Sequence, residues 1–130
     1  MGVALLDTSI VIATLNRDDA LHEAASRSVR AERERSTLAI SALTYAELLL
    51  GPMRTGGRAL GVVEGFAAQV RIIDLSPEIA RRAAEERVAR GLKLPDAVIV
   101  ATGLLHADLI LTADARWKGV ERVTVVERQS

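Results

Sequence analysis

Four acidic residues stand at the ends or beginnings of strongly apolar segments of this chain: Asp7, Glu47, Asp96 and Asp114. The chain has no cysteine, so a site built from these side chains would offer oxygen ligands only. Such ligands favour a hard ion such as Mg²⁺ or Mn²⁺ over softer metals. An ion of this kind suits phosphate chemistry, because it binds non-bridging oxygens and lowers the pKa of an attacking water. Whether the acids form one site depends on the elements that carry them.

Asp7 also suits a simpler role. It follows the apolar residues 3–6, and apolar residues return at helical spacing from Ile10 to Leu15. This pattern predicts a buried strand that turns directly into a helix. An aspartate at such a junction is a common helix N-cap. Both roles are compatible, and the other three acids decide whether Asp7 acts alone.

The apolar patterning of the rest predicts strands that alternate with helices. Further strands are expected at 37–41, 70–75, 109–112 and 123–126. Helices are expected at 8–15, after the polar residues 16–19 as far as about 34, at 42–50 before Gly51-Pro52, and at 58–69, 77–90 and 94–106. The helix at 94–106 is apolar almost all round and is expected to be buried. The sequence therefore predicts a three-layer α/β domain with a largely parallel sheet.

In such a fold, ligands collect at the carboxyl ends of the strands. Asp7 ends the first strand, and Asp114 lies two residues beyond the fourth. Asp96 is in the first turn of the helix that leads to the fourth strand, and Glu47 is in the helix after the second. Since helices that join parallel strands begin at that same edge, all four acids are expected there. Anions so close would raise one another's pKa, so the site must hold protons or cations.

Glu47 has an unusual position within its predicted helix. It shares a helix face with Leu43, Ala46 and Leu50, which predicts an acid at the edge of a buried apolar stripe. Glutamate is seldom buried without a partner. The placement favours a functional role for this side chain.

Length and composition limit the other classes of protein. A chain of 130 residues with 49% hydrophobic residues fits one domain, taken here as residues 1–130. The longest apolar stretches fall short of the roughly 20 residues that span a bilayer, and no secretory leader is apparent. A soluble cytoplasmic protein is expected, with no membrane partner. The net charge is zero and only three residues are aromatic, so any nucleic acid would be bound locally and through its backbone.

Four segments resemble, in order and spacing, the motifs of the PIN-domain family, and within it those of the VapC-type ribonuclease toxins of bacterial toxin–antitoxin pairs. The segments are Leu6-Asp7-Thr8-Ser9, Leu43-Thr44-Tyr45-Ala46-Glu47-Leu48, Leu94-Pro95-Asp96-Ala97-Val98-Ile99-Val100-Ala101, and Ala107-Asp108-Leu109-Ile110-Leu111-Thr112-Ala113-Asp114 with Trp117. The likeness covers essentially the whole chain. One departure is Ala113, where many relatives have asparagine.

The resemblance implies a Mg²⁺- or Mn²⁺-dependent endoribonuclease that holds one or two ions. Asp7, Glu47, Asp96 and Asp114 would be its catalytic and metal-binding acids, and the hydroxyls of Ser9 and Thr112 would support them. It further implies a five-stranded parallel sheet, a homodimer, and inhibition by a cognate antitoxin protein that often carries an arginine into the acidic pocket. Asp108 is expected to fix the turn before the fourth strand and is left out of the catalytic set.

Five basic residues are candidates for holding RNA phosphates. They stand near the acids in the sequence or in adjoining loops and helix starts: Arg54, Arg58, Lys93, Arg116 and Lys118. Their role is a hypothesis from proximity and from the affinity of cations for phosphate.

Other classes of protein stay open at this stage. A receiver-type signalling domain is also a Mg²⁺-binding α/β domain of this length, and Asp74 and Thr112 would be its phosphoacceptor and switch hydroxyl. It would, however, need a second acid after Asp7, where Thr8 stands, and a lysine near the last strand. A haloacid-dehalogenase phosphatase would need an aspartate in place of Ser9. A non-catalytic binding module on the PIN fold is the third alternative.

Overall fold

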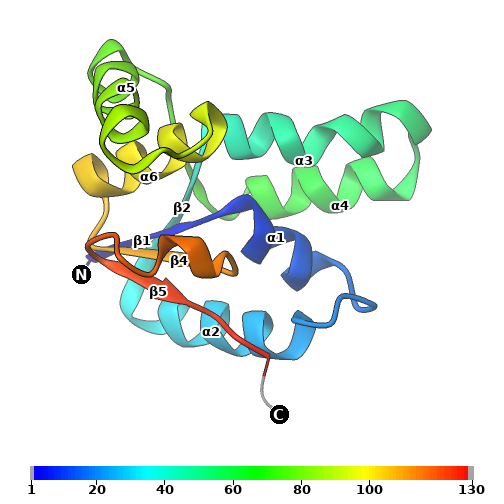
Figure 1. Cartoon of the computed structure of the whole chain (residues 1–130). Coiled ribbons are helices and arrows are strands. Elements are labelled where there is room, and N and C mark those ends of the chain that lie inside the picture. The colour runs from blue at the N-terminus through cyan, green and yellow to red at the C-terminus, as the bar shows by residue number, and fades with distance from the viewer. Residues whose placement is uncertain (1, 129–130) are drawn as a thin grey trace.

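A computed structural model describes residues 2–128 of the chain. Its five strands are β1 (Gly2–Leu6), β2 (Ser36–Ser41), β3 (Arg71–Ile73), β4 (Leu109–Thr112) and β5 (Val123–Val125). Its helices are α1 (Thr8–Leu15), α2 (His22–Arg35), α3 (Ala42–Thr55), α4 (Arg58–Ala67), α5 (Pro77–Arg90) and α6 (Leu94–His106), with the short 3₁₀ helix η1 (Ala115–Trp117). Figure 1 shows these elements around a central sheet. No helix within the described range is long and apolar enough to cross a membrane.

The five strands form one sheet in the order β3-β2-β1-β4-β5, and every pairing is parallel. In the central strand, Leu5 stands opposite Ala39 of β2 and Ile110 of β4. The predicted α/β fold with a five-stranded parallel sheet is therefore confirmed. The strand order also argues against a receiver domain, whose doubly wound sheet has the order 2-1-3-4-5. Asp74 follows β3 at the outer edge of the sheet, two strands away from β1.

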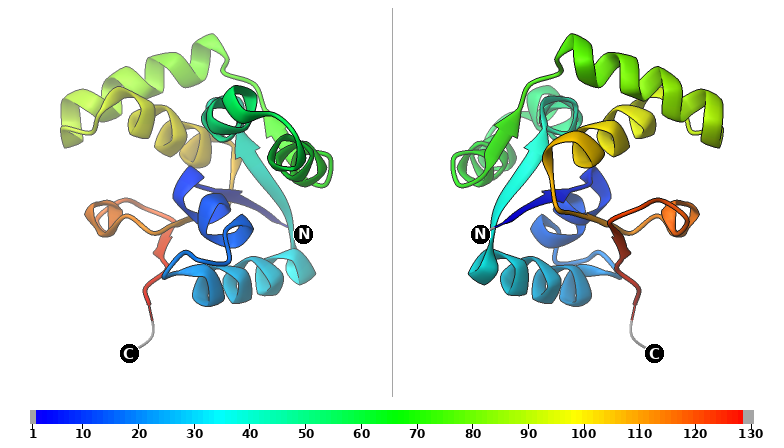
Figure 2. Two further views of the ribbon diagram at one scale, coloured as in Figure 1. Left: turned by 90° about the vertical axis from the view of Figure 1, so that its right-hand side faces the viewer. Right: turned by 90° about the vertical axis from the view of Figure 1, so that its left-hand side faces the viewer.

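The core divides into two apolar clusters because successive side chains of a strand point to opposite faces of the sheet. Leu5 belongs to the cluster under α5 and α6, whereas Ala4 and Leu6 belong to the cluster formed with α1 to α4. The side views show α5 and α6 on one side of the sheet and α1 and α2 on the other (Figure 2). This is the three-layer arrangement that the sequence predicts.

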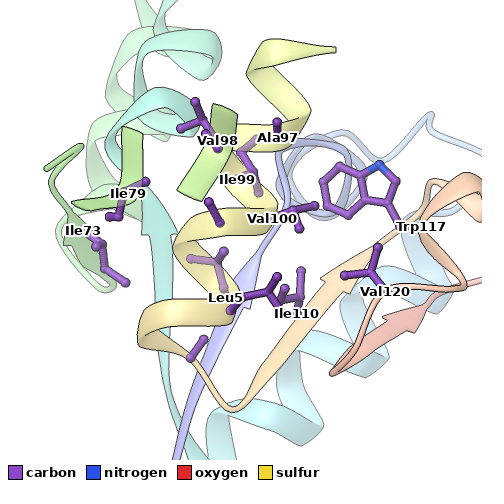
Figure 3. Close-up of a cluster of buried hydrophobic side chains, with 14 of the residues drawn as sticks. Leu5, Ile73, Ile79, Ala97, Val98, Ile99, Val100, Ile110, Trp117 and Val120 are labelled. Atoms are coloured by element: carbon purple, nitrogen blue, oxygen red, sulfur yellow. The ribbon is translucent and has the colours of Figure 1, made fainter. Parts of the chain in front are cut away.

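Helix α6 is the most deeply buried helix, as its sequence predicts, with every residue from Ala97 to Leu104 buried. Its backbone comes so close to β4 that a Cβ added at Gly103 would stand 2.3 Å from the Ile110 side chain. The indole of Trp117, from η1, fills the space beside Val100 and Val120 in the same cluster (Figure 3). This packing fixes α6 and η1, which carry two of the four acids, against the sheet.

Two details at the ends of elements bear on the site. Asp108 accepts a hydrogen bond from the Val3 amide (2.8 Å), so it ties the turn before β4 to the start of β1, away from the carboxyl edge. Helix α3 does not stop before Gly51-Pro52, as predicted, but continues to Thr55. Proline inside a helix lacks an N–H donor and crowds the carbonyl four residues earlier, but it does not always end the helix. The Pro52 carbonyl accepts from the Gly56 amide, and Gly56 ends the helix in a positive-φ conformation.

Candidate active site

Asp7 stands at the centre of the acidic edge, at the end of the middle strand. It is 6% exposed. One carboxylate oxygen accepts hydrogen bonds from the hydroxyls of Ser9 (2.7 Å) and Thr112 (2.8 Å), and the other accepts one from the Thr8 amide (2.8 Å). Asp7 is therefore the N-cap of α1 and, at the same time, the meeting point of the two hydroxyls that were expected to support the site.

Burial sets the protonation behaviour of two of the acids. The pKa of Asp7 is raised, first because burial disfavours the anion and then because of the nearby charge of Asp96, although the three hydrogen bonds oppose this shift. The pKa of Asp96 is raised by burial and by Asp114, against the opposing charges of Arg116 and Lys93. Asp7 is thus coupled to Asp96, and Asp96 to Asp114. These three acids share one electrostatic environment.

Asp114 is paired with an arginine two residues further along the chain. The Nε atom of Arg116 lies 3.0 and 3.1 Å from the two carboxylate oxygens, and its Nη2 atom lies 2.6 Å from Oδ2. The pKa of Asp114 is lowered, mainly by the hydrogen bonds from this guanidinium. The same Nη2 atom lies 3.9 Å from Oδ2 of Asp96. Arg116 is therefore a cation that Asp96 and Asp114 share.

Glu47 is positioned by a residue that the sequence did not single out for this role. The Thr8 hydroxyl donates a 2.6 Å hydrogen bond to Glu47 Oε1 and lies 3.0 Å from the hydroxyl of Thr44, which is fully buried. The buried side of α3 consists of Thr44 and Leu48, so the predicted buried stripe with Leu50 is wrong: Leu50 is 59% exposed. The only sequence signal for Thr8 was its place directly after Asp7, because contact with another helix depends on the fold.

The five basic candidates are all exposed, but they lie in different places. Arg116 covers the acids, and Lys93 acts on Asp96 through its charge. Lys118 is directed to Glu127, 2.8 Å away. Arg54 and Arg58 flank the turn at the far end of the α3–α4 hairpin (Figure 1).

An apolar groove of about 710 Å³ runs between α1, α3 and α4 and reaches Glu47. Ile12 and Val62, each 45% exposed, are among its apolar lining residues. Arg58 also lines it. The groove therefore combines an apolar surface with one acidic and one basic side chain beside the site.

The donor set at the acidic edge fits a hard divalent ion in its chemistry. All four acids offer oxygen atoms, and Asp96 and Asp114 already approach one cationic group. Within residues 2–128, however, no three carboxylate or imidazole side chains converge closely enough to hold a metal ion as they stand. Asp96 and Asp114 face the guanidinium of Arg116, and Lys93 adds a second positive charge near Asp96.

A parallel α/β fold with acids at the carboxyl edge of its sheet defines a class of protein, and comparison with known proteins gives the family. A sequence profile of the PIN domain matches residues 4–123, and the chain belongs to the PIN-domain family. Proteins of this family are nucleases.

Solved structures agree with this assignment. A toxin–antitoxin complex from Klebsiella pneumoniae is 28% identical, with a TM-score of 0.82 over 97% of this chain and 99% of that one. VapBC2 from Rickettsia felis, bound to a promoter DNA fragment, is 19% identical, with a TM-score of 0.74 over 95% and 96% of the two chains. VapC20 from Mycobacterium tuberculosis, described as a sarcin–ricin loop cleaving toxin, is 21% identical, with a TM-score of 0.71 over 95% and 99%. The chain therefore has the fold of the VapC-type PIN domains.

Proposed function

We propose that this protein is a metal-dependent endoribonuclease, the toxin of a toxin–antitoxin pair. The observation that carries the proposal is the gathering of Asp7, Asp96 and Asp114, with Glu47 beside them, at the carboxyl edge of a PIN-family sheet. The likeness to a toxin that cleaves the sarcin–ricin loop supports RNA as the substrate. We expect the protein to act in the cytoplasm.

Each side chain has a role in this proposal. Asp7, Asp96, Asp114 and Glu47 would hold one or two Mg²⁺ or Mn²⁺ ions. When bound, the metal supplies charge neutralisation at the scissile phosphate and a water of lowered pKa. The hydroxyls of Ser9 and Thr112 hold the Asp7 carboxylate in one orientation. Thr8 orients Glu47 in the same way.

Neither histidine is near enough to these acids to act as the general base. The His22 ring makes a hydrogen bond with the Ala13 carbonyl, and His106 lies 3.7 Å from Glu78. RNA phosphates would be held by exposed cations. We assign this role to Lys93, Arg116 and Lys118 near the acidic edge, and to Arg54 and Arg58 at the far end of the α3–α4 hairpin.

Partners follow from the same proposal. We expect a cognate antitoxin to bind beside the acidic edge, in the apolar groove between α1, α3 and α4. Support comes from the exposed apolar side chains there and from the relatives solved as complexes with antitoxins. We also expect the protein to form a homodimer.

Cleavage of total RNA tests the proposal. We expect the wild type to cleave RNA with Mg²⁺ or Mn²⁺ and not with a chelator. Asp7→Asn and Asp96→Asn are each expected to lower the rate by more than about 100-fold, because even the partners of metal ligands are worth about 10–100-fold. Arg81→Ala, at an exposed position of the outer helix α5, is the control and is expected to leave cleavage unchanged. Equal cleavage by all variants would contradict the proposal, and RNA binding without cleavage under either metal would favour a non-catalytic module.

A further inference from the structure

Arg116 occupies the acidic edge in a way that the proposed metal site does not by itself require. Its guanidinium contacts both carboxylate oxygens of Asp114 and approaches Asp96, yet its side chain is 71% exposed. We propose that Arg116 is a built-in counter-ion, which neutralises Asp96 and Asp114 in the metal-free protein and which a divalent ion must displace in order to bind. This inference rests on the proposed metal-dependent function and adds a competitor for its site.

The geometry sets the two cations in competition. A carboxylate has about four lone-pair sites, and the guanidinium that contacts both oxygens of Asp114 occupies part of them. A metal ion that uses Asp96 and Asp114 together needs the space between them, where Nη2 of Arg116 lies 2.6 Å from one carboxylate and 3.9 Å from the other. A guanidinium left beside a divalent cation would also be repelled by it. Metal binding therefore favours movement of the Arg116 side chain away from both carboxylates.

The local structure allows this movement without disturbing the fold. Trp117, the residue that follows, is 1% exposed and packs in the core, so the backbone of η1 is anchored. The Arg116 side chain lies outside this core and is solvent-exposed. An exposed ion pair is weak, so a rotation about side-chain bonds releases it at low cost.

Once displaced by a metal ion, the Arg116 side chain could bind a phosphate of the RNA. The two other cations near the acids are placed differently, since Lys118 lies 2.8 Å from Glu127 and Lys93 stands at the N-cap of α6. A guanidinium freed from two carboxylates, on an anchored turn beside the metal, is in reach of a phosphate at the same edge. Arg116 would thus neutralise the acids without metal and bind RNA when metal is present.

Metal affinity provides the first test. Mn²⁺ binding is measured by isothermal titration calorimetry for the wild type, Arg116→Ala and Arg116→Lys. Removing an exposed but bidentate competitor is expected to tighten Mn²⁺ binding by about fivefold. Arg116→Lys is expected to lie between the two, because an ammonium group cannot make the bidentate contact. The control is Arg81→Ala, which removes an exposed cation on α5 and is expected to bind Mn²⁺ as the wild type does.

The side chain itself provides the second test. In a ¹⁵N-labelled wild-type protein, the Nε–Hε signal of Arg116 is expected to shift, and its exchange with water to accelerate, as Mg²⁺ saturates the site. Arg82, whose Nε donates to Glu86 at 3.1 Å, is the internal reference and should not respond. An unchanged Arg116 signal at saturation, or equal or weaker Mn²⁺ binding by Arg116→Ala, would overturn the inference and leave the nuclease proposal intact. Absence of metal binding in every variant would overturn both.

Discussion

Asp7 illustrates how one residue serves both folding and chemistry. As an N-cap it receives the Thr8 amide, which any good cap would do. The hydroxyls of Ser9 and Thr112 then compensate part of the cost of burying the charge. A residue that served only as the N-cap of α1 would not need to be buried, nor to accept hydrogen bonds from the Ser9 and Thr112 hydroxyls. We infer that the site retains an anion here despite its cost to stability.

That cost predicts a pH-dependent stability difference between the wild type and Asp7→Asn. The pKa of Asp7 is raised above its ordinary value of 3.8 in the folded protein. At pH values between the pKa of Asp7 in the unfolded chain and its raised pKa in the folded protein, the folded state binds more protons than the unfolded state. The wild type therefore loses stability as the pH rises through this range. Asparagine does not titrate, and the stability of Asp7→Asn relative to the wild type is therefore expected to increase from about pH 4 towards neutrality.

Urea unfolding without metal, followed by the fluorescence of Trp117, measures this difference. Trp117 is the only tryptophan and is buried, so its emission reports on the core. Repeating the series with Mg²⁺ is expected to stabilise the wild type more than the variant, since a ligand that binds only the folded state raises its stability. A difference that stays constant across the pH range would contradict the prediction.

Among the elements, the sequence of α6 is the most restricted, because this helix has to satisfy two structural requirements. It must bring Asp96 to the acidic edge, and it must pass over β4 with its backbone almost in contact with the Ile110 side chain. Glycine satisfies the second demand at Gly103, although a glycine inside a helix normally costs stability. The close packing is what holds the N-terminal turn of α6 over the edge of the sheet.

Gly103→Ala is therefore expected to destabilise the protein by about 1–3 kcal/mol, as overpacking in a core does. The matched control is Gly61→Ala in α4, where an added Cβ meets no atom within 4 Å. That change is expected to stabilise the protein by about 0.5–1 kcal/mol, because alanine is the better helix former. Urea unfolding of both variants checks the pair. Equal effects of the two substitutions would show that α6 does not pack against β4 as described.

At the scale of the whole molecule, the order of the strands decides which segments adjoin the site. With β1 central and β4 and β2 on either side, Asp7, Asp114 and the start of α3 come to one edge. The α3–α4 hairpin then extends from this edge and forms, with α1, the apolar groove that reaches Glu47. A protein bound in this groove would lie next to Glu47, one of the four acids of the proposed site.

The groove predicts variants that separate inhibition from catalysis. Ile12→Asp combined with Val62→Asp is expected to weaken antitoxin binding by at least about 100-fold, because two charges would have to be buried in the interface. RNA cleavage is expected to persist, since neither residue is among the acids. Val88→Asp is the control, because Val88 is 88% exposed on α5, outside the groove. The measurements are antitoxin affinity and RNA cleavage by the purified proteins. Unchanged antitoxin affinity of the double variant would place the partner elsewhere.

Much of this molecule was predictable because the signals are local. Apolar periodicity gave α1, α6 and β4 with their observed ends, since it reports directly which side of an element is buried. The ends of α5 follow from the capping residues Ser76 and Gly91. The acids at strand ends and helix starts were expected at one edge, because parallel connections bring those ends together. The extension of α3 past Pro52 was not predictable in this way, because Gly51 and Pro52 are local helix breakers, yet the helix ends only at Gly56 in a positive-φ conformation.

The sequence by itself determined the class of fold, the four acids and the edge of the sheet where they belong. Only the tertiary structure decided how these side chains are partnered. Thr8 in α1 supports Glu47 in α3, and Arg116 joins Asp114 to Asp96, which stands 20 residues before Arg116 in the chain. The physical reason is that a strand or helix forms from the pattern of its own residues, whereas the partner of a charged side chain is set by distances that exist only after the chain has folded.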